Sequence, residues 1–286
     1  IIIIGYNMAK INIDNINIEY EIIGNSGPIL ALMPGARRGY LEMKTLAEKI
    51  SKNNIRVLLH DRRNTGASDM LLDDNATEEV VWADELHNLF KAIGEEKVFV
   101  SGSSSGARTA LMYALRHPES LLGLIIMRVT GGKFAAQRLP VNYYKNFIDI
   151  ARKEGMEGVA KTPRFLEYIG TNPSVYKNLI NMDKELFIKV QSNLLDKFLN
   201  GAELPVMGIT ESELNSIKVP SLVIPGNDNT HNSESGKTAS VMLGNSELHE
   251  LPIEDVDVDL IPWSQWYDYE NEISNVMSRF INNIAS

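Results

Sequence analysis

Five consecutive residues, Gly102-Ser103-Ser104-Ser105-Gly106, have the types and the spacing of a turn that presents a reactive serine. They follow a strand-like run at 97–100 and begin a helical pattern of small residues at 105–116. In a strand–turn–helix of this kind the middle residue is strained, and small residues two positions away let strand and helix approach each other. The spacing therefore selects Ser104 as a nucleophile. A serine-rich turn without a chemical role is the alternative.

A serine that attacks a carbonyl group needs N–H donors aimed at the oxyanion that develops. One donor is expected at the backbone of Ser105, where the helix begins. The other is expected in the loop that follows the apolar run at 28–33 and starts with Pro34-Gly35-Ala36. Ala36 is the better choice because Gly35 lets the backbone turn before it. A simple turn that ends a strand is the alternative.

The patterns around these motifs predict that a parallel sheet positions them. Short apolar runs are typical of strands buried on both faces, and they lie at 28–33, 55–59, 97–100 and 121–127. Two further strands are expected at 221–224 and 247–251. Helical patterns fill the gaps, at 40–50, 77–93, 105–116, 235–243 and 270–284. Alternating runs at 10–13 and 16–22 predict an antiparallel hairpin at the edge. We expect an α/β fold with a doubly wound, mostly parallel sheet of about eight strands.

The alternation of strand and helix stops near Phe134 and resumes after Ser216. Between them the sequence is helical and rich in aromatic residues, with breaks at glycine and proline. We therefore predict a sheet core at 8–132 and 217–286, interrupted by a helical cap or lid at 133–216. Met8-Ala9-Lys10 is typical of a natural start, so Ile1 to Asn7 are left out of the expected fold.

Composition limits the class of protein and its partners. The 286 residues carry a net charge of −9 and include no cysteine, which excludes disulfides, thiolate metal sites and a cysteine nucleophile. The acidic balance argues against a general nucleic-acid binder, which needs a basic face. The sequence contains no run of 18 apolar residues, so it predicts no membrane span. We expect a small-molecule substrate or ligand, no nucleic acid, no membrane, no cofactor, no metal and a cytoplasmic location.

The order of motifs along the chain resembles the α/β-hydrolase superfamily. The similarity covers roughly 10–130 and 217–285, and its motifs are Pro34-Gly35-Ala36, His60-Asp61-Arg62-Arg63-Asn64-Thr65-Gly66-Ala67-Ser68, the serine turn and Arg116-His117-Pro118-Glu119-Ser120. Two positions depart from the superfamily: Pro34 replaces a histidine and Asn64 replaces a glycine. The resemblance implies the fold and the hydrolysis of an ester, amide, thioester or related bond, without naming a substrate.

The resemblance also implies an acid and a histidine after the nucleophile, in this order. The run at 221–224 leads into Pro225-Gly226-Asn227-Asp228, which resembles the acid turn, so Asp228 is the expected orienting carboxylate. A histidine is expected after the last strand, but no histidine follows His249. In its place the sequence offers carboxylates, at Glu254, Asp255, Asp257 and Asp259.

Five histidines can be weighed as the base. His87 lies within a helical pattern, His117 ends a helix, and His60 ends a strand at a position that is usually buried. His249 falls in the last strand, roughly 10 Å too early at ~3.3 Å per residue. His231 is the best candidate because it lies just after Asp228 at the catalytic edge of the sheet, although acid and base normally come from different loops.

Three accounts of the site remain open. In the first, His231 acts as the base from an unusual position. In the second, a carboxylate of the loop after 247–251 acts as the base, although a carboxyl group with a pKa near ~4 is a weak base. In the third account the site binds a ligand without turnover. The Asp-Val-Asp-Val-Asp pattern favours an exposed loop over a cation site.

The first hypothesis is a carboxylesterase-like serine hydrolase that acts on a small, partly apolar ester or related acyl substrate through an acyl-Ser104 intermediate. The alternative is a ligand-binding protein that keeps the pocket and lacks the general base. Phe134, Tyr143 and Tyr144 are the expected substrate-binding residues of the insertion. Arg128, Thr130, Arg37 and Arg38 are unusual residues near a carbonyl site, and any of them that points inward would favour an anionic group on the substrate. Arg37 and Arg38 are expected at the surface.

Overall fold

The computed structural model describes residues 9–72, 76–201 and 203–285, so the segment before Ala9 lies outside the described residues. Its centre is an eight-stranded sheet with the order β1-β2-β4-β3-β5-β6-β7-β8. The strands are β1 (Ala9–Ile13), β2 (Ile16–Ile23), β3 (Ile29–Met33), β4 (Arg56–His60), β5 (Val98–Ser103), β6 (Leu121–Met127), β7 (Ser221–Ile224) and β8 (Ser246–Leu248). Strands β3 to β8 pair in parallel, and β2 pairs antiparallel with both β1 and β4. The predicted α/β fold with a mostly parallel eight-stranded sheet is confirmed.

The edge hairpin forms as its sequence predicts. Asp14 and Asn15 have φ values of 51° and 67°, and they join β1 to β2 as a two-residue turn. Two residues with positive φ match the right-handed twist of the flanking strands, and Asp and Asn tolerate this region. The antiparallel edge is therefore a consequence of local turn chemistry.

Alternating side chains of the buried strands feed two cores. In β3, Ile29, Ala31 and Met33 point to one face of the sheet, and Leu30 and Leu32 point to the other. Because successive strand residues face opposite ways, a strand that is apolar throughout needs helices on both sides.

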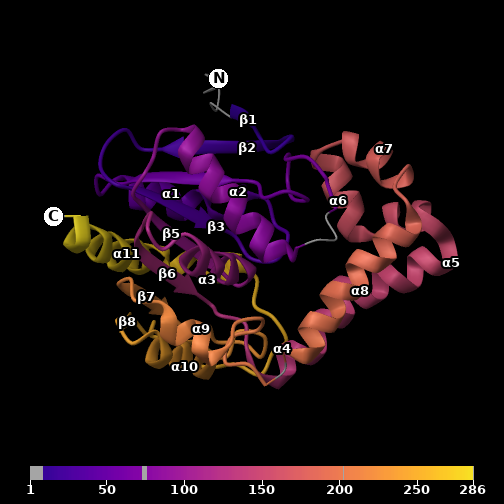
Figure 1. Ribbon diagram of the computed structural model, residues 1–286. Coiled ribbons are helices and arrows are strands. Elements are labelled where there is room, and N and C mark those ends of the chain that lie inside the picture. The colour runs from indigo at the N-terminus through magenta and orange to yellow at the C-terminus, as the bar shows by residue number, and fades with distance from the viewer. Residues whose placement is uncertain (1–8, 73–75, 202, 286) are drawn as a thin grey trace.

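Helices cover both faces (Figure 1). One face packs against α2 (Glu78–Ala92), α3 (Ser105–Arg116), α9 (Glu211–Ser216) and α10 (Ser233–Leu243), and the other against α1 (Lys44–Ser51), η3 (Trp263–Tyr269) and α11 (Glu270–Ala285). A short 3-10 turn, η1 (Tyr40–Met43), precedes α1. No helix in the described part of the chain is long and apolar enough to cross a membrane.

The insertion forms a group of helices beside the sheet, on the right in Figure 1. Its elements are α4 (Gly132–Pro140), η2 (Val141–Lys145), α5 (Asn146–Ala160), α6 (Pro163–Thr171), α7 (Ser174–Ile180) and α8 (Lys184–Asn200). These helices bury small apolar clusters of their own, one around Phe187 and one around Tyr144 and Phe198. The division of the chain at 133 and 216 stays a prediction.

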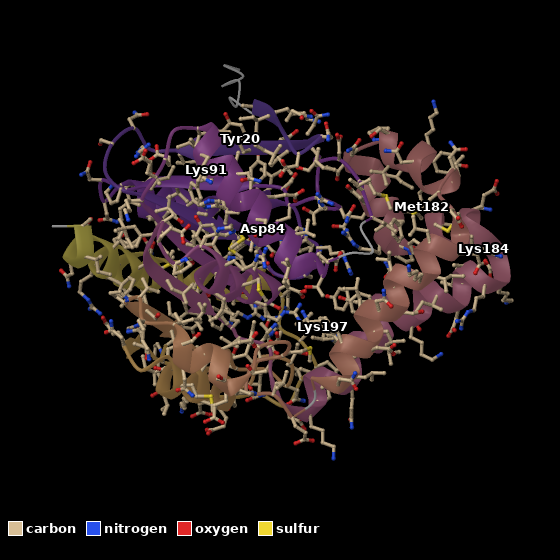
Figure 2. All side chains as sticks on the ribbon, in the orientation of Figure 1. Tyr20, Asp84, Lys91, Met182, Lys184 and Lys197 are labelled. Atoms are coloured by element: carbon tan, nitrogen blue, oxygen red, sulfur yellow. The ribbon has the colours of Figure 1, made fainter. Side chains whose placement is uncertain are left out.

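Polar contacts join these helices to the rest of the molecule. Figure 2 shows Lys197 on the side of α8 that faces the sheet, and its Nζ lies 3.9 Å from Oε2 of Glu79 in α2. Tyr168 of α6 donates a hydrogen bond of 3.0 Å to the carbonyl of Ser68. Arg38 and Glu167 pair at 3.2 Å across the same boundary. The helical group is thus held over the loops at the carboxyl ends of the parallel strands.

Candidate active site

Ser104 lies between β5 and α3 with φ 56° and ψ −115°, a conformation that costs energy for a residue with a side chain. Its flanking glycines permit the turn. A Cβ added to Gly102 would lie 2.3 Å from the Gly106 carbonyl carbon, and one added to Gly106 would lie 2.6 Å from the Met33 oxygen. The sharp turn therefore requires the spacing of small residues that the sequence shows.

The structure brings His231 to Ser104 and Asp228 to His231. Ser104 Oγ lies 2.8 Å from His231 Nε2, and His231 Nδ1 lies 3.0 and 3.1 Å from the two carboxylate oxygens of Asp228. With the proton on Nδ1, the ring donates to Asp228 and accepts from the serine hydroxyl. The three side chains thus form a continuous hydrogen-bonded chain, the arrangement that a nucleophile, a base and an orienting acid require.

A tight turn places acid and base three residues apart on one loop. Asp228 Oδ1 accepts hydrogen bonds from the backbone N–H groups of Thr230 at 2.9 Å and His231 at 2.8 Å. An aspartate that binds backbone donors two and three residues ahead curls the chain around its own carboxylate. Gly226 leaves room for this curl, because a Cβ there would lie 2.5 Å from the Cβ of His231.

Arg128 holds the other side of the Asp228 carboxylate. This residue directly follows β6, has φ 48° and is 4% exposed. Its guanidinium donates to Asp228 Oδ2 at 3.0 Å and, through the same nitrogen, to the carbonyl of Ile261. The N–H of Ile261 also donates to Asp228 Oδ2, at 3.0 Å. Asp228 is therefore bound on every side by the loops after β6, β7 and β8.

The acidic loop after β8 braces the loop that carries His231. Its carboxylates are exposed, and two of them accept hydrogen bonds from that neighbouring loop: Asp255 from Ser233 at 2.6 Å and Asp257 from Asn229 at 2.8 Å. The backbone N–H of Asn229 also donates to Val258 O at 2.9 Å. The hydrogen-bond partner of Ser104 is an imidazole and not one of these carboxylates.

Burial and charge set the protonation states of the pair. Burial tends to raise the pKa of Asp228, but the hydrogen bonds from His231 and Ile261 and the charge of Arg128 bring it well below its usual range. Burial lowers the pKa of His231; its hydrogen bond to Asp228 opposes this effect and the Arg128 charge adds to it. At neutral pH the acid is therefore ionised and the imidazole is neutral, as a general base requires.

The loop after β3 carries Ala36, the predicted second donor, which lines the same pocket as Ser104 and Ser105. Ala36 has φ 45°, and neither its N–H nor that of Ser105 has an acceptor among the described residues. The loop is fixed from behind, because the Ala36 carbonyl accepts from Ser105 Oγ at 2.6 Å and from Arg62 at 2.9 Å. Arg62 is 2% exposed, also donates to Pro34 O and lies 4.4 Å over the Trp82 ring. Two backbone donors thus stay free beside Ser104.

A chamber of mixed apolar and charged walls opens at Ser104. It holds about 380 Å³ of space between atoms, partly open to solvent, and is lined by Ala36, Arg37, Glu78, Trp82, Ser104, Ser105, Arg108, Thr130, Leu139, Tyr143, Tyr144 and Phe198. Tyr143 and Tyr144 both line this chamber, and their substrate-binding role stays a prediction. Phe134 does not line this chamber and is 38% exposed, because α4 buries Ala135 and Leu139 on its inner side. The expected role of Phe134 is therefore corrected.

The two arginines of the oxyanion loop point in different directions. Arg38 is exposed and pairs with Glu167, as expected. Arg37 turns inward: its side chain is 13% exposed, it binds Glu78 through two nitrogens at 2.6 and 3.2 Å, and its guanidinium lies 5.3 Å from the Tyr144 ring centre. The surface placement expected for Arg37 is wrong, because the Glu78 carboxylate and the Tyr144 ring stabilise its guanidinium at the chamber wall.

The other histidines lie away from Ser104. His60 is 3% exposed at the end of β4, and His249 pairs with Glu272 at 2.9 Å. His87, His117 and Glu119 form the only group of potential metal ligands within the described residues. The two imidazoles stack face to face with centroids 3.9 Å apart, so their in-plane lone pairs do not converge on one ion.

Sequence reasoning missed several residues of this site. Glu78 and Arg108 line the chamber, and the sequence analysis named neither of them. Arg108 follows Ser104 by one helical turn, which is a signal that could have identified it. Arg128 was expected near the site, and the structure shows that its guanidinium binds Asp228.

A family model described as the alpha/beta hydrolase fold matches residues 33–230. This stretch contains the serine turn and ends just before His231. The chain belongs to the α/β-hydrolase family.

Known proteins of the family extend the match to nearly the whole chain. A 2-hydroxy-6-oxononadienedioate/2-hydroxy-6-oxononatrienedioate hydrolase of Pseudomonas putida is 24% identical over 269 residues, 88% of this chain and 87% of that protein. An uncharacterized hydrolase of Bacillus subtilis is 30% identical over 115 residues, 40% of this chain and 42% of its own. The crystal structure of a hydrolase from Pseudomonas aeruginosa superimposes with a TM-score of 0.67 at 17% identity, covering 97% and 99% of the two chains. These similarities establish the fold and leave the substrate open.

Proposed function

We propose that the protein is a serine hydrolase, carboxylesterase-like, that cleaves a small, partly apolar ester or related acyl substrate. The observation that carries this proposal is the 2.8 Å contact between Ser104 Oγ and His231 Nε2, with Asp228 on the far side of the ring. A neutral, buried imidazole beside a strained serine has the geometry and the protonation state of a general base.

In the proposed reaction His231 Nε2 takes the hydroxyl proton as Ser104 Oγ bonds to the carbonyl carbon. The carbonyl oxygen becomes an oxyanion that accepts from the N–H groups of Ala36 and Ser105. Collapse of this intermediate breaks the bond to the leaving group, which receives the proton from His231. Water, deprotonated by His231, then attacks the acyl-Ser104 ester, and its hydrolysis restores the serine.

The helices at 133–216 act in this proposal as the cap of the substrate chamber. Tyr143 and Tyr144 of η2 and Phe198 of α8 form its outer wall, opposite Ser104. Aromatic walls with a few placed polar groups are typical of sites for small, partly apolar ligands.

Labelling with a fluorophosphonate probe tests the proposal. The wild-type protein should be labelled, and Ser104→Ala should not. Ser103→Ala is the matched control, because this neighbouring serine is buried and should leave the labelling intact. Absence of labelling in the wild type, or labelling that persists in Ser104→Ala, would reject Ser104 as the nucleophile.

A ligand-binding protein without a general base is the competing function. Its main support is the absence of a histidine after β8, and the position of His231 weighs against it because this ring occupies the base position from another loop. Steady hydrolysis of p-nitrophenyl acetate that disappears in both Ser104→Ala and His231→Ala would separate the hydrolase from the binding protein.

A further inference from the structure

A second chamber adjoins the one at Ser104. It holds about 400 Å³ of space between atoms and has apolar walls formed by Met70, Leu72, Phe147, Phe165 and Phe187. The two chambers share three wall residues, Arg37, Glu78 and Tyr143. We call the second one the distal chamber. The two chambers are therefore adjacent, with these three residues between them.

Arg164 brings a positive charge without an ion-pair partner to the distal chamber, where the Tyr168 ring centre lies 5.7 Å from its guanidinium and Glu167 acts on it from beyond ion-pair distance. Arg164 lies in α6, and no described carboxylate comes within the 4.0 Å of an ion pair. Its guanidinium donates one long hydrogen bond, 3.4 Å, to the Asn64 carbonyl. Glu167, on the same helix, is instead paired with Arg38 at 3.2 Å. Burial and the nearby Arg37 lower the pKa of Arg164 to about 10, so the side chain stays charged at neutral pH.

The neighbouring Arg37 and Arg108, unlike Arg164, each have an ion-pair partner. Arg37 is bound to Glu78 at 2.6 Å, and Arg108 is 3.3 Å from Glu79. Because Arg37 and Glu78 cancel, Arg164 leaves the distal chamber with a net positive charge inside a protein whose overall charge is −9. Partly buried charges are normally paired, so an anion is the missing partner.

Gln191 provides a second polar group without a partner. This residue of α8 is 6% exposed, lines the distal chamber, and its amide makes no hydrogen bond to any described residue. The amide atoms are not fully buried, so they reach the open space of the chamber, where a ligand can bind them. A guanidinium and an amide NH₂ together present the donors that a carboxylate accepts.

We propose that the distal chamber binds a carboxylate at the far end of the substrate, with Arg164 as its ion-pair partner and Gln191 as a further hydrogen-bond donor. This inference rests on the proposed function, because the acyl carbonyl at Ser104 defines the other end. The substrate class is then an apolar acyl chain that ends in a carboxylate. Met70, Phe147, Phe165 and Phe187 contact the chain between its two polar ends.

The test measures binding and not turnover, so it does not depend on a reactive serine. In a Ser104→Ala background, calorimetry compares monomethyl esters of the C6, C8 and C10 linear dicarboxylic acids with their dimethyl esters, which are nearly the same size and neutral. The monomethyl ester of one chain length should bind about 10- to 100-fold more tightly than its dimethyl ester, as a charge-assisted hydrogen bond allows.

Arg164→Met should remove this preference, and Arg164→Lys should restore part of it. Arg152→Met is the matched control: it removes the same charge from an exposed position of α5 and should leave the preference unchanged. Thermal unfolding of each variant shows that it is folded. Equal affinity for the two esters at every chain length, or loss of the preference in Arg152→Met as well, would overturn the inference.

The two proposals can fail separately. An Arg164-dependent preference in a protein that fluorophosphonate does not label would keep the anion site and reject the hydrolase. Labelling at Ser104 with no preference for the monomethyl ester would keep the hydrolase and reject the anion site.

Discussion

Two neighbouring loops at the carboxyl edge of the sheet contribute unequally to the site. The loop after β7 carries both Asp228 and His231, whereas the loop after β8, where the family resemblance places the histidine, contributes only the backbone of Ile261 to the same network. The difference teaches that the histidine beside the serine can come from the loop after β7 instead of the loop after β8. A tight turn around the acid then brings the imidazole within hydrogen-bond distance of the serine. The second loop then serves as a brace.

Removal of the His231 imidazole from the loop after β7 should have the largest effect on activity. His231→Ala is expected to lower kcat for ester hydrolysis by on the order of 10⁴-fold or more, because the serine loses its proton acceptor. His249→Ala, at the histidine nearest the second loop, is the matched control and should change kcat by less than about twofold. A small loss in His231→Ala would mean that the base is elsewhere.

Asp228→Asn should have the next largest effect, a decrease in kcat of about 10³-fold. The amide cannot stabilise the imidazolium, and its NH₂ group would face Nδ1 and favour the wrong tautomer. Circular dichroism checks that the loop still folds, and kcat for p-nitrophenyl acetate gives the magnitude. A decrease below about tenfold would contradict the role of Asp228 as the orienting acid.

Arg128→Met tests the junction between the loops. We expect kcat/KM to decrease by about tenfold and unfolding free energy by about 1–3 kcal/mol, because the buried Ile261 carbonyl and Asp228 lose a donor. Urea denaturation and steady-state kinetics measure the two quantities. Arg128→Lys keeps the charge and should recover part of both.

The pH profile distinguishes this positioning role from a purely structural one. In the wild type, kcat/KM should fall as the pH is lowered and His231 becomes protonated. The midpoint of this fall should lie below the ordinary histidine pKa near ~6.5, since the pKa of His231 is lowered. Removal of the Arg128 charge makes the imidazolium less unfavourable, so the midpoint should move to higher pH. An unchanged midpoint in Arg128→Met would leave Arg128 with a packing role only.

The smallest effect is expected in the acidic loop. Asp255→Asn and Asp257→Asn change exposed carboxylates that accept hydrogen bonds from Ser233 and Asn229 beside His231, and each should change kcat by no more than about twofold. A decrease of 10²-fold or more in either variant would support a carboxylate as the base and reverse the comparison between the two loops.

The parts of the fold that follow from local patterns could be predicted. The strand at 121–127 and the helix at 105–116 form with the expected bounds, and Asp14-Asn15 makes the expected turn. Periodicity and turn chemistry act over a few residues, so the sequence shows them directly. The last strand ends earlier than expected, at Leu248, because the chain leaves the sheet to form the long loop that braces the site.

The site was predictable only in part. Ser104 was identifiable because its turn is a local motif. His231 was one candidate among several, since its proximity to Ser104 depends on how far the loop after β7 reaches across the sheet edge. Phe134 was misplaced because the phase of α4 decides which aromatic residue faces the chamber.

The sequence by itself determined the sheet, the strained serine turn and the acid turn, because each depends on residues that are neighbours in the chain. Only the tertiary structure decided that the imidazole of His231 reaches Ser104, that Arg128 joins three loops at Asp228, and that Arg164 lines a chamber whose one carboxylate, Glu78, is paired with Arg37. Hydrogen bonds and ion pairs depend on distances of about 3 Å between atoms. Packing of distant segments sets those distances, and no local pattern records them.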